Sequence, residues 1–444
     1  MTDTLNKSSL YKTDAHTRRR NGAEKRFKLY GILAISVGIL ALIALVVSIV
    51  GNGAGSFRQT FITLEIALPA DKLDKEGNRD PEEMASVSTF GYAPLIRNAV
   101  VAHAEAIGFD VDLSAKDMGG IISKSAPAAL RDYVLANPDS VDGTVTMEFL
   151  VNGRIDGYYK GRITAEIAEL DGNVSPEQLQ LADAFLEDGI LETRFNFGFL
   201  TEPDASGQRP ESAGLGVAML GSLYMMIVVL CLALPIGVAA SIYLEEFAPK
   251  NRWTDVIEVN ISNLAAVPSI VFGILGLAIF INFAGLPQSA PIVGGLVLTL
   301  MTLPTIIIST RAALKAVPPS IRDAALGVGA SKMQAVFHHV LPLAAPGILT
   351  GTIIGLAQAL GETAPLLLIG MVAFVKEYPA AFTPESGLFG EPATALPVQV
   401  FNWTQRSDPA FVERASGAII VLLVFLVIMN GIAIYLRRRF ERRW

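Results

Sequence analysis

Six apolar runs, each long enough to cross a lipid bilayer, recur along this chain of 444 residues. A helix needs about 20 mostly apolar residues to span the hydrocarbon core, and hydrophobic residues make up 51% of the whole chain. Because lipid offers no partner to a free backbone N–H or C=O, we predict an all-α polytopic membrane protein with six transmembrane helices. The runs are, approximately, 29–50, 213–243, 256–283, 291–310, 343–373 and 415–436.

Basic residues concentrate in three of the polar segments that flank the runs, and this bias predicts an orientation. Segments 1–28, 311–341 and 437–444 are rich in lysine and arginine, whereas 51–212 and 374–414 are not. Since basic flanks stay in the cytoplasm, both termini are expected there. The first run is too long for a signal-peptide core and lacks a convincing cleavage site, so we expect an uncleaved anchor.

The segment 51–212 differs in composition from the rest of the chain. It contains 27 acidic and 13 basic residues, a balance that suits an external face, where the positive-inside bias does not apply. The same acidity argues against nucleic acid or an anionic membrane surface as a partner. The length lies in the usual range of a domain, so we expect a folded external domain, to which the sequence assigns no activity.

Local patterns within this segment predict an α+β fold. Residues 144–151 alternate roughly as a strand should, and Asn152-Gly153 is a hairpin-turn signal, so residues 158–167 are expected to form the returning strand. Residues 94–106 and 176–186 carry apolar side chains at helical spacing. The domain is therefore predicted to be an α+β insertion between the first two membrane spans.

Several classes of chemistry find no support in the residues. A single cysteine, Cys231, allows no intramolecular disulfide, and the four histidines form no metal-ligand constellation, so no cofactor or metal is expected. No Gly-Lys dipeptide occurs, so there is no phosphate-binding loop of the Walker A type. If transport by this chain is driven by ATP, the ATPase must be another chain.

The polar loop between the fourth and fifth runs carries two helix-start signatures. Ser320 is followed three residues later by Asp323, and Ser331 by Gln334. Each hydroxyl can accept from a free backbone N–H at the start of a helix while the later side chain reaches back. We therefore predict two short helices with a bend at 327–329.

The same loop resembles the coupling loop of ABC importer permeases. The resemblance rests on Asp323-Ala324-Ala325, on Gly329 and on Leu341-Pro342, which stand in the register of that family's loop. In the family this loop docks on a cytoplasmic ATPase, and the small side chains of Ala324, Ala325 and Gly329 would permit close approach. The sequence departs from the family at Asp323, usually glutamate, and at His339, usually aliphatic. An ordinary helix–loop–helix connector is the alternative.

Glu362 is an ionisable residue past the middle of the fifth run. A carboxylate near the bilayer centre costs about 3 kcal/mol or more, so it must face the bundle or a polar cavity and have a partner. Gly361 and Pro365 weaken the helix around it. Broken helices at membrane depth are tolerated where they line a pathway. Glu362 is therefore a candidate pathway residue, with a structural kink as the alternative.

Neutral polar residues in the third, fourth and fifth runs are further candidates for the pathway. Their hydroxyl and amide groups could hydrogen-bond an oxyanion that sheds its water, or they could hold neighbouring helices together. Both roles remain open for each residue. The candidate translocation residues are Glu362, Thr363, Gln358, Asn263, Ser269 and Thr305.

Three further motifs narrow the resemblance. Gly-Glu-Thr-Ala-Pro at 361–365, Pro-Ser-Ile-Val-Phe-Gly at 268–273, and Pro235-Ile236-Gly237 with Tyr243-Leu244-Glu245, together with the coupling loop, are similar to PstA-type permeases of bacterial phosphate importers. The similarity covers about 195–444, and 51–212 is a large insertion relative to the short family form. The family often has an arginine where this chain has Gln358, so the cation that binds the anion could come from the partner permease.

The resemblance implies a permease subunit of an ATP-driven importer of inorganic phosphate in the bacterial inner membrane. It implies that the chain is not an enzyme and is surrounded by membrane lipid. The partners it implies are a second, homologous permease subunit in a heterodimer, two cytoplasmic ATPase subunits and a periplasmic phosphate-binding protein. Coupling to the ATPase would run through the loop 320–342.

Other functions remain as alternatives to a phosphate permease. Within transport, the substrate could be another oxyanion or a small polar solute. A membrane sensor or receptor with a periplasmic domain is a different class, but the eight residues after the sixth run leave no room for a signalling domain. An intramembrane enzyme would need a catalytic pair at membrane depth, such as His with Asp, and the sequence contains none.

Overall fold

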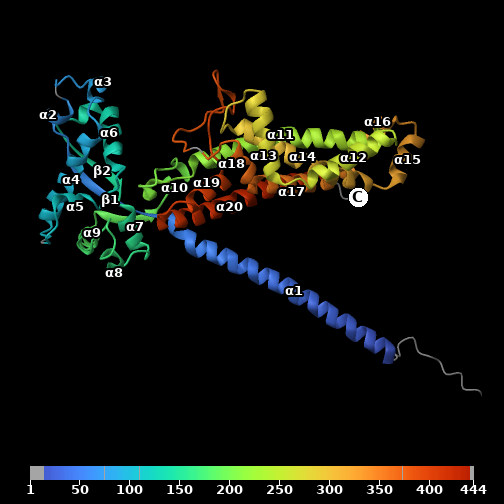
Figure 1. Cartoon of the computed structure of the whole chain (residues 1–444), viewed down its shortest axis with the longest axis horizontal. Helices are drawn as coiled ribbons and strands as arrows, with labels where there is room; N and C mark the ends of the chain where they lie inside the picture. The colour runs from blue at the N-terminus through green and yellow to red at the C-terminus, as the bar shows by residue number, and fades with distance from the viewer. Residues whose placement is uncertain (1–14, 75, 110, 373, 441–444) are drawn as a thin grey trace, which may run out of the picture. The chain divides into compact units, whose positions relative to one another are not determined.

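The computed structural model describes residues 15–440 except 75, 110 and 373, and it divides into two units that meet at Asn52 and Gly53. The first unit contains all of α1, Ala15–Gly53, except its last residue, and the apolar stretch of this helix is long enough to cross a membrane (Figure 1). The first predicted run, 29–50, lies inside this helix. The second unit contains both the inserted domain and the remaining helices.

The inserted domain is built on a three-stranded antiparallel sheet in the order β2-β1-β3. The strands are β1, Arg58–Ala67, β2, Thr144–Leu150, and β3, Leu191–Phe195. Alternation along β1 buries Ile62, Leu64 and Ile66, because successive side chains of a strand point to opposite faces. The expected α+β fold is confirmed.

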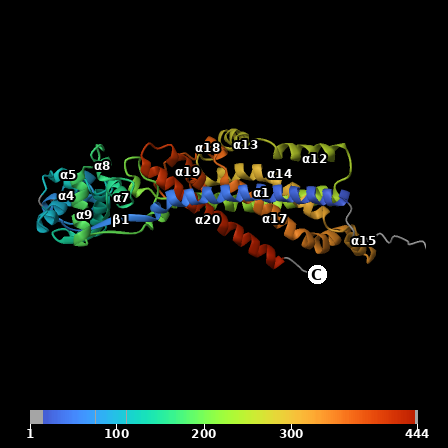
Figure 2. The same cartoon turned by 90° about the horizontal axis from the view of Figure 1, so that it is seen from below.

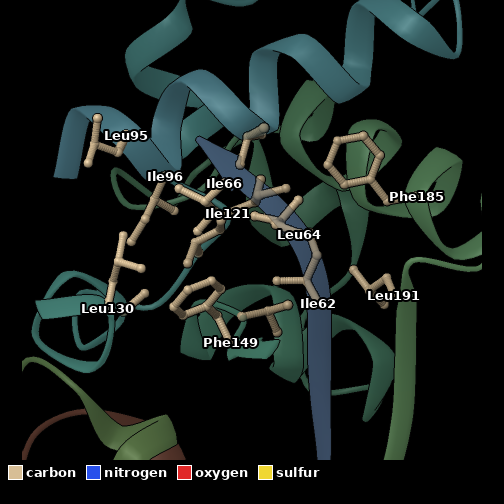
Figure 3. Close-up of a cluster of buried hydrophobic side chains, with 14 of the residues drawn as sticks. Ile62, Leu64, Ile66, Leu95, Ile96, Ile121, Leu130, Phe149, Phe185 and Leu191 are labelled. Atoms are coloured by element: carbon tan, nitrogen blue, oxygen red, sulfur yellow. The ribbon is translucent and has the colours of Figure 1, made fainter. Parts of the chain in front are cut away.

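Helices from three parts of the chain complete the core of this domain. They are α4, Thr89–Ala106, α6, Ala126–Ala136, and α9, Pro176–Asp188. Figure 3 shows the side chains that meet above the sheet; the labelled ones are Ile62, Leu64, Ile66, Leu95, Ile96, Ile121, Leu130, Phe149, Phe185 and Leu191. This cluster gives the insertion a hydrophobic core of its own.

The predicted hairpin of the domain is wrong, although its first strand is correct. Asn152 does not turn the chain back; its side chain accepts from the Arg154 N–H and caps α7, Gly153–Tyr159. The expected returning strand at 158–167 instead falls in α7 and α8, Ala165–Ala168. Asparagine favours both turns and helix N-caps, and here β2 pairs with the distant β1. Both predicted helices, 94–106 and 176–186, are confirmed within α4 and α9.

Short elements connect these parts of the domain. They are η1, Ala54–Phe57, α2, Ala70–Leu73, α3, Pro81–Met84, α5, Ala115–Gly119, η2, Pro138–Ser140, α10, Gly198–Thr201, and η3, Pro210–Ser212.

Among the remaining long helices, α11 and α17 pack against α14, Pro291–Lys315, whereas α20 packs against α17. These helices are α11, Gly216–Ile242, with its π-helical continuation η4, Tyr243–Phe247; α16, Lys332–Ala335, with η6, Val336–Val340, and α17, Leu341–Gly361; and α20, Pro409–Phe440. Close approach depends on glycine, since a Cβ at Gly295 of α14 would lie 2.5 Å from the Val228 Cβ of α11. With α1, five helices in the described part of the chain can span a membrane (Figures 1 and 2).

The third predicted run, 256–283, is not one straight helix. It forms α12, Arg252–Ala265, and α13, Ser269–Gly276, continued by the π-helical η5, Leu277–Phe283, and the pair is bent by 102°. Pro268 explains the bend, because the residue before a proline is driven out of the helical region. Counted as one bent span, the pair brings the total to the expected six.

The fifth predicted run, 343–373, ends as a long helix earlier than expected. α17 stops at Gly361, and after a break the short α18 covers Ala364–Leu368. The segment beyond it contains a small hairpin, β4, Phe382–Thr383, with β5, Gly387–Leu388, and then α19, Leu396–Thr404. The helix break predicted around Gly361 and Pro365 is therefore present.

Candidate functional site

The loop between α14 and α17 begins with α15, Pro319–Gly327. Pro319 is its first residue, a position where the missing N–H of proline costs nothing. The capping box expected from Ser320 and Asp323 is wrong, because Pro318 and not Ser320 is the N-cap. The second capping box is confirmed: the Gln334 N–H donates to Ser331 Oγ at 3.2 Å, and the Ser331 N–H donates to Gln334 Oε1 at 2.9 Å.

The bend between the two short helices lies where the glycines predicted it. α15 ends at Gly327, and Gly329 adopts a φ of +89°, a left-handed conformation that glycine reaches without a steric cost. The chain then enters α16 at the Ser331 cap. This turn sets α15 and α16 as separate helices at one end of the bundle.

Ion pairs fix α15 to the bundle. The Arg322 guanidinium lies 2.6 Å from Glu246 Oε1, and it also donates to the carbonyls of Leu314 and Val317 at 2.9 and 2.8 Å. Arg311 of α14 lies 2.6 Å from Glu258 of α12. These bonds join the ends of α11, α12, α14 and α15, so the loop is held by the helices that surround it.

The exposed face of α15 differs from the predicted docking surface at one residue. Asp323, Ala324 and Gly329 are exposed, as expected, but Ala325 is only 5% exposed. Ala325 lies four residues after Ile321, which also packs inward, and this i, i+4 spacing was the available signal. Leu341 and Pro342 are half-buried at the start of α17.

Two apolar residues of this loop were missed by sequence reasoning. Leu326 is 47% exposed and Val328 is 86% exposed, and both flank the bend. A nearby open groove of about 360 Å³ is lined by apolar side chains, including Phe247, Met333 and Phe337. We refer to Asp323, Ala324, Leu326, Val328 and Gly329 as the α15 face.

The break after α17 brings two of the sequence motifs together. Glu362 is half-buried and extended, with φ −79° and ψ 129°. Pro365, at the end of the same motif, packs on Gly273, where a Cβ would lie 2.7 Å from the Pro365 Cα. Gly-Glu-Thr-Ala-Pro and Pro-Ser-Ile-Val-Phe-Gly therefore meet in the fold, through close contact of α18 with α13.

The candidate translocation residues differ in their exposure. Thr363, Ser269 and Thr305 are half-buried, whereas Gln358 and Asn263 are exposed. The ion-pair partner expected for Glu362 is not found among the residues that the structure describes in 15–440. The break therefore places Glu362 near the α13–α18 contact, and no cation among the described residues pairs with it.

A buried cluster of charges, which sequence reasoning missed, joins the inserted domain to α20. The Lys160 ammonium lies 2.6 Å from Asp156 and 3.3 Å from Glu413, and Arg162 Nε lies 2.5 Å from Glu413. The side chains of Lys160, Asp156 and Glu413 are 6%, 2% and 8% exposed. Ser56 adds a hydrogen bond to the Glu413 carbonyl at 2.9 Å.

Arg414 and Glu211 extend the same cluster. Arg414 donates to Gln59 Oε1 at 2.7 Å and to the Glu211 carbonyl at 2.9 Å. The Glu211 carboxyl accepts from Ser123 at 2.5 Å. Burial raises the pKa of Glu211 and lowers the pKa of Lys160. We call Asp156, Lys160, Arg162, Glu211, Glu413 and Arg414 the junction cluster.

Two stretches of the chain match known protein families. Residues 233–444 match the binding-protein-dependent transport system inner membrane component, and residues 14–169 match a domain of unknown function, DUF3333. A probable ABC transporter permease protein, YqgI, of Bacillus subtilis is 31% identical over 54% of this chain and 82% of its own length. The chain belongs to the family of ABC transporter permeases.

Two further relatives of the permease confirm the predicted resemblance to PstA-type proteins. The phosphate transport system permease protein PstA of Mycobacterium leprae is 30% identical over 50% of this chain and 71% of its own. The protein of the same name from Xylella fastidiosa is 30% identical over 50% and 73%. A solved methionine ABC transporter, MetNI, aligns with 51% of the permease and 95% of its own chain, at 16% identity and a TM-score of 0.40.

Family membership settles the broad class of the protein. As an ABC transporter permease, it is a non-catalytic, multi-pass membrane subunit, and ATP hydrolysis belongs to a separate subunit. The receptor and intramembrane-enzyme alternatives are therefore set aside.

Proposed function

We propose that this permease imports inorganic phosphate. The observation that carries the proposal is the contact between Pro365 and Gly273, which packs together the two motifs that resemble PstA-type permeases. Relatives named as phosphate permeases match this same half of the chain. Transporters often place substrate at discontinuous helices, and the break from Gly361 to Pro365 is such a place.

The α15 face is the proposed contact with the ATPase, at the cytoplasmic end of the bundle. Lys315, Arg322 and Lys332 lie on or beside this loop, and cytoplasmic loops favour basic residues. Leu326 and Val328 leave apolar side chains in water, and a bound partner would cover them. The inserted domain then lies on the periplasmic side, where a phosphate-binding protein would deliver substrate.

The proposed complex contains a second, homologous permease and two ATPase subunits. α12 has no buried residue, and it exposes Trp253, Val256 and Ile257. The second permease would cover such surface, with lipid around the rest of the bundle. A cation from that subunit would supply the partner that Glu362 lacks among the described residues of this chain.

Glu362 is proposed to act through a paired cation and not as a phosphate ligand, because an ionised carboxylate repels the anion. Glu362→Gln should therefore assemble with its partners but import phosphate poorly, since the freed cation would hold phosphate too tightly. Thr363→Ser, which keeps the hydroxyl at the next residue, is the matched control. Assembly is checked by pull-down and transport by radiolabelled phosphate uptake in vesicles. Normal uptake by a fully assembled Glu362→Gln complex would show that Glu362 belongs only to the structural kink and has no part in transport.

Substrate choice is tested with the complex that co-purifies with the tagged chain. Reconstituted with its ATPase and binding protein, it should accumulate radiolabelled phosphate in an ATP-dependent manner, and excess sulfate or molybdate should not compete. ATP-dependent uptake of another oxyanion, with no uptake of phosphate, would show a permease for that oxyanion instead.

A further inference from the structure

Six aromatic rings form a row that runs from the surface of the inserted domain into the helical bundle. Neighbouring ring centroids lie 4.5 to 6.5 Å apart, a range in which aromatic side chains attract one another. The pairs are Phe197–Phe195 at 4.7 Å, Phe195–Phe57 at 6.3 Å, Phe57–Phe199 at 5.3 Å, Phe199–Trp403 at 6.1 Å and Trp403–Phe411 at 6.4 Å.

The two ends of this row differ in exposure. Phe199, Trp403 and Phe411 are at most 1% exposed, and they form a core with α10, α19 and α20. Phe195 and Phe197 are 47% and 70% exposed. The rings of Phe195 and Phe197 meet edge to face, and this exposed aromatic pair at the end of a packed row is a costly surface to leave in water.

The row lies at the level where the apolar part of α20 begins. Ser56, next to Phe57, donates to the Glu413 carbonyl, and a Cβ at Gly417 would lie 2.6 Å from the Ser56 side chain. The apolar stretch of α20 follows these residues and ends before Arg437. An α20 that crosses the bilayer over this stretch would bring Phe57 and its neighbours to one boundary between the hydrocarbon core and the headgroups.

The cationic side chain of Arg58 belongs to the residue that pairs with Phe195 in the sheet. Arg58 is exposed and is the register partner of Phe195, and side chains that face each other across an antiparallel ladder lie on the same side of the sheet. Aromatic side chains are enriched at membrane interfaces, and a guanidinium binds phosphate in two-pronged fashion. Apolar rings and a cation at this depth match the chemistry of a lipid headgroup and its upper acyl chain.

We propose that Phe195, Phe197 and Arg58 form a lipid foothold, by which the inserted domain rests on the bilayer surface. The rings enter the headgroup region, and Arg58 contacts lipid phosphate. The foothold fixes the height of the domain over the membrane independently of what the permease carries. Because the domain as a whole is acidic, zwitterionic phosphatidylcholine suits this contact better than anionic lipid.

The test places an environment-sensitive fluorophore at one position of the full-length permease in phosphatidylcholine nanodiscs. The single native cysteine allows a Cys231→Ser background, into which Phe197→Cys or Phe195→Cys is introduced. Phe90→Cys is the matched control, since Phe90 is an aromatic residue of the same domain, is 88% exposed and lies in α4. Quenching by lipid carrying a nitroxide at the headgroup is compared with quenching by iodide in water.

The foothold predicts strong nitroxide quenching and weak iodide quenching at 197 and 195, and the reverse at 90. Iodide quenching at 197 as strong as at 90 would overturn the proposal. Protection of both positions from both quenchers would also overturn it, because a protein partner and not lipid would then cover the rings. Phe195→Cys keeps the test decisive if labelling at 197 disturbs the fold.

Discussion

The two ends of the helical bundle use charged side chains in opposite ways. At the loop end, Arg322 is 22% exposed and ties the short helix α15, whose outer face is exposed, to the bundle, while Arg311, 15% exposed, ties α14 to α12. At the domain end, Asp156 and Glu413 are 2% and 8% exposed, and the surfaces they join are already closed within one chain. The proposed ATPase would cover the loop end, whereas at the domain end the two surfaces already cover each other.

The energetic consequence of this difference follows from burial. Removing one member of a buried set of charges leaves the others unpaired, at a cost of about 3–5 kcal/mol. Pairs nearer the surface contribute much less, about 0–1 kcal/mol when fully exposed. Changes at the domain end should therefore act on folding, and changes at the loop end on coupling.

The largest expected effect is that of Glu413→Gln. Lys160 and Arg162 would each lose one of the two carboxylates that they share and would keep Asp156, so the free energy of unfolding should fall by at most about 3–5 kcal/mol. Thermal unfolding in detergent measures the change, and Glu192→Gln, in an exposed pair with Arg194, is the control. An unchanged midpoint for Glu413→Gln would show that the junction cluster does not hold the two parts together.

Arg322→Ala should increase local unfolding of α15. The variant loses charge-assisted hydrogen bonds to Glu246 and to two carbonyls, each worth about 1.5–3 kcal/mol where charged. Hydrogen exchange over 319–327 should rise sharply while the rest of the bundle keeps its protection. The Lys315 side chain is 59% exposed, so Lys315→Ala should leave this exchange unchanged. Equal exchange in both variants would show that Arg322 does not hold α15 in place.

Substitutions at two neighbouring alanines of α15 test its packing and its docking on the ATPase separately. Ala325 is buried, so Ala325→Trp should overpack its site and cost about 1–3 kcal/mol. Ala324 is exposed, so Ala324→Trp should leave the melting midpoint intact and abolish substrate-stimulated ATP hydrolysis by the assembled transporter. Wild-type ATPase stimulation in Ala324→Trp would show that Ala324 is not part of the docking surface.

The smallest expected effect is a change in the pH dependence of stability, and it concerns Glu211 of the junction cluster. Burial raises the pKa of Glu211, so the stability gained from its proton is present below the unfolded pKa and is lost as pH rises through the folded pKa. Glu211→Gln keeps an acceptor for Ser123 without the charge. The melting midpoint of Glu211→Gln, relative to that of the wild type, should rise as pH goes from acidic to neutral; a constant difference would show that folding does not shift the pKa of Glu211.

Sequence reasoning predicted the parts of this fold that depend on local patterns. Apolar runs located the membrane helices, and Ser331 with Gln334 located the start of α16, because each of these signals lies within one continuous stretch of the chain. Ala325 was predicted to lie on the exposed face but is buried. Which side chains of α15 face outward depends on the residue at which the helix begins, Pro319. The junction cluster joins Arg162 to Glu413, and no local pattern connects residues so far apart in the chain.

Cross-linking at the bend between α15 and α16 tests the central claim most directly. In a Cys231→Ser background, Val328→Cys carries a short photoreactive group, and Phe90→Cys in the inserted domain is the control. Val328 is 86% exposed at the loop end, so the account predicts efficient cross-linking to the co-purifying ATPase from 328 and none from 90. Absence of an ATPase adduct at 328 in an assembled, ATP-hydrolysing complex would contradict it.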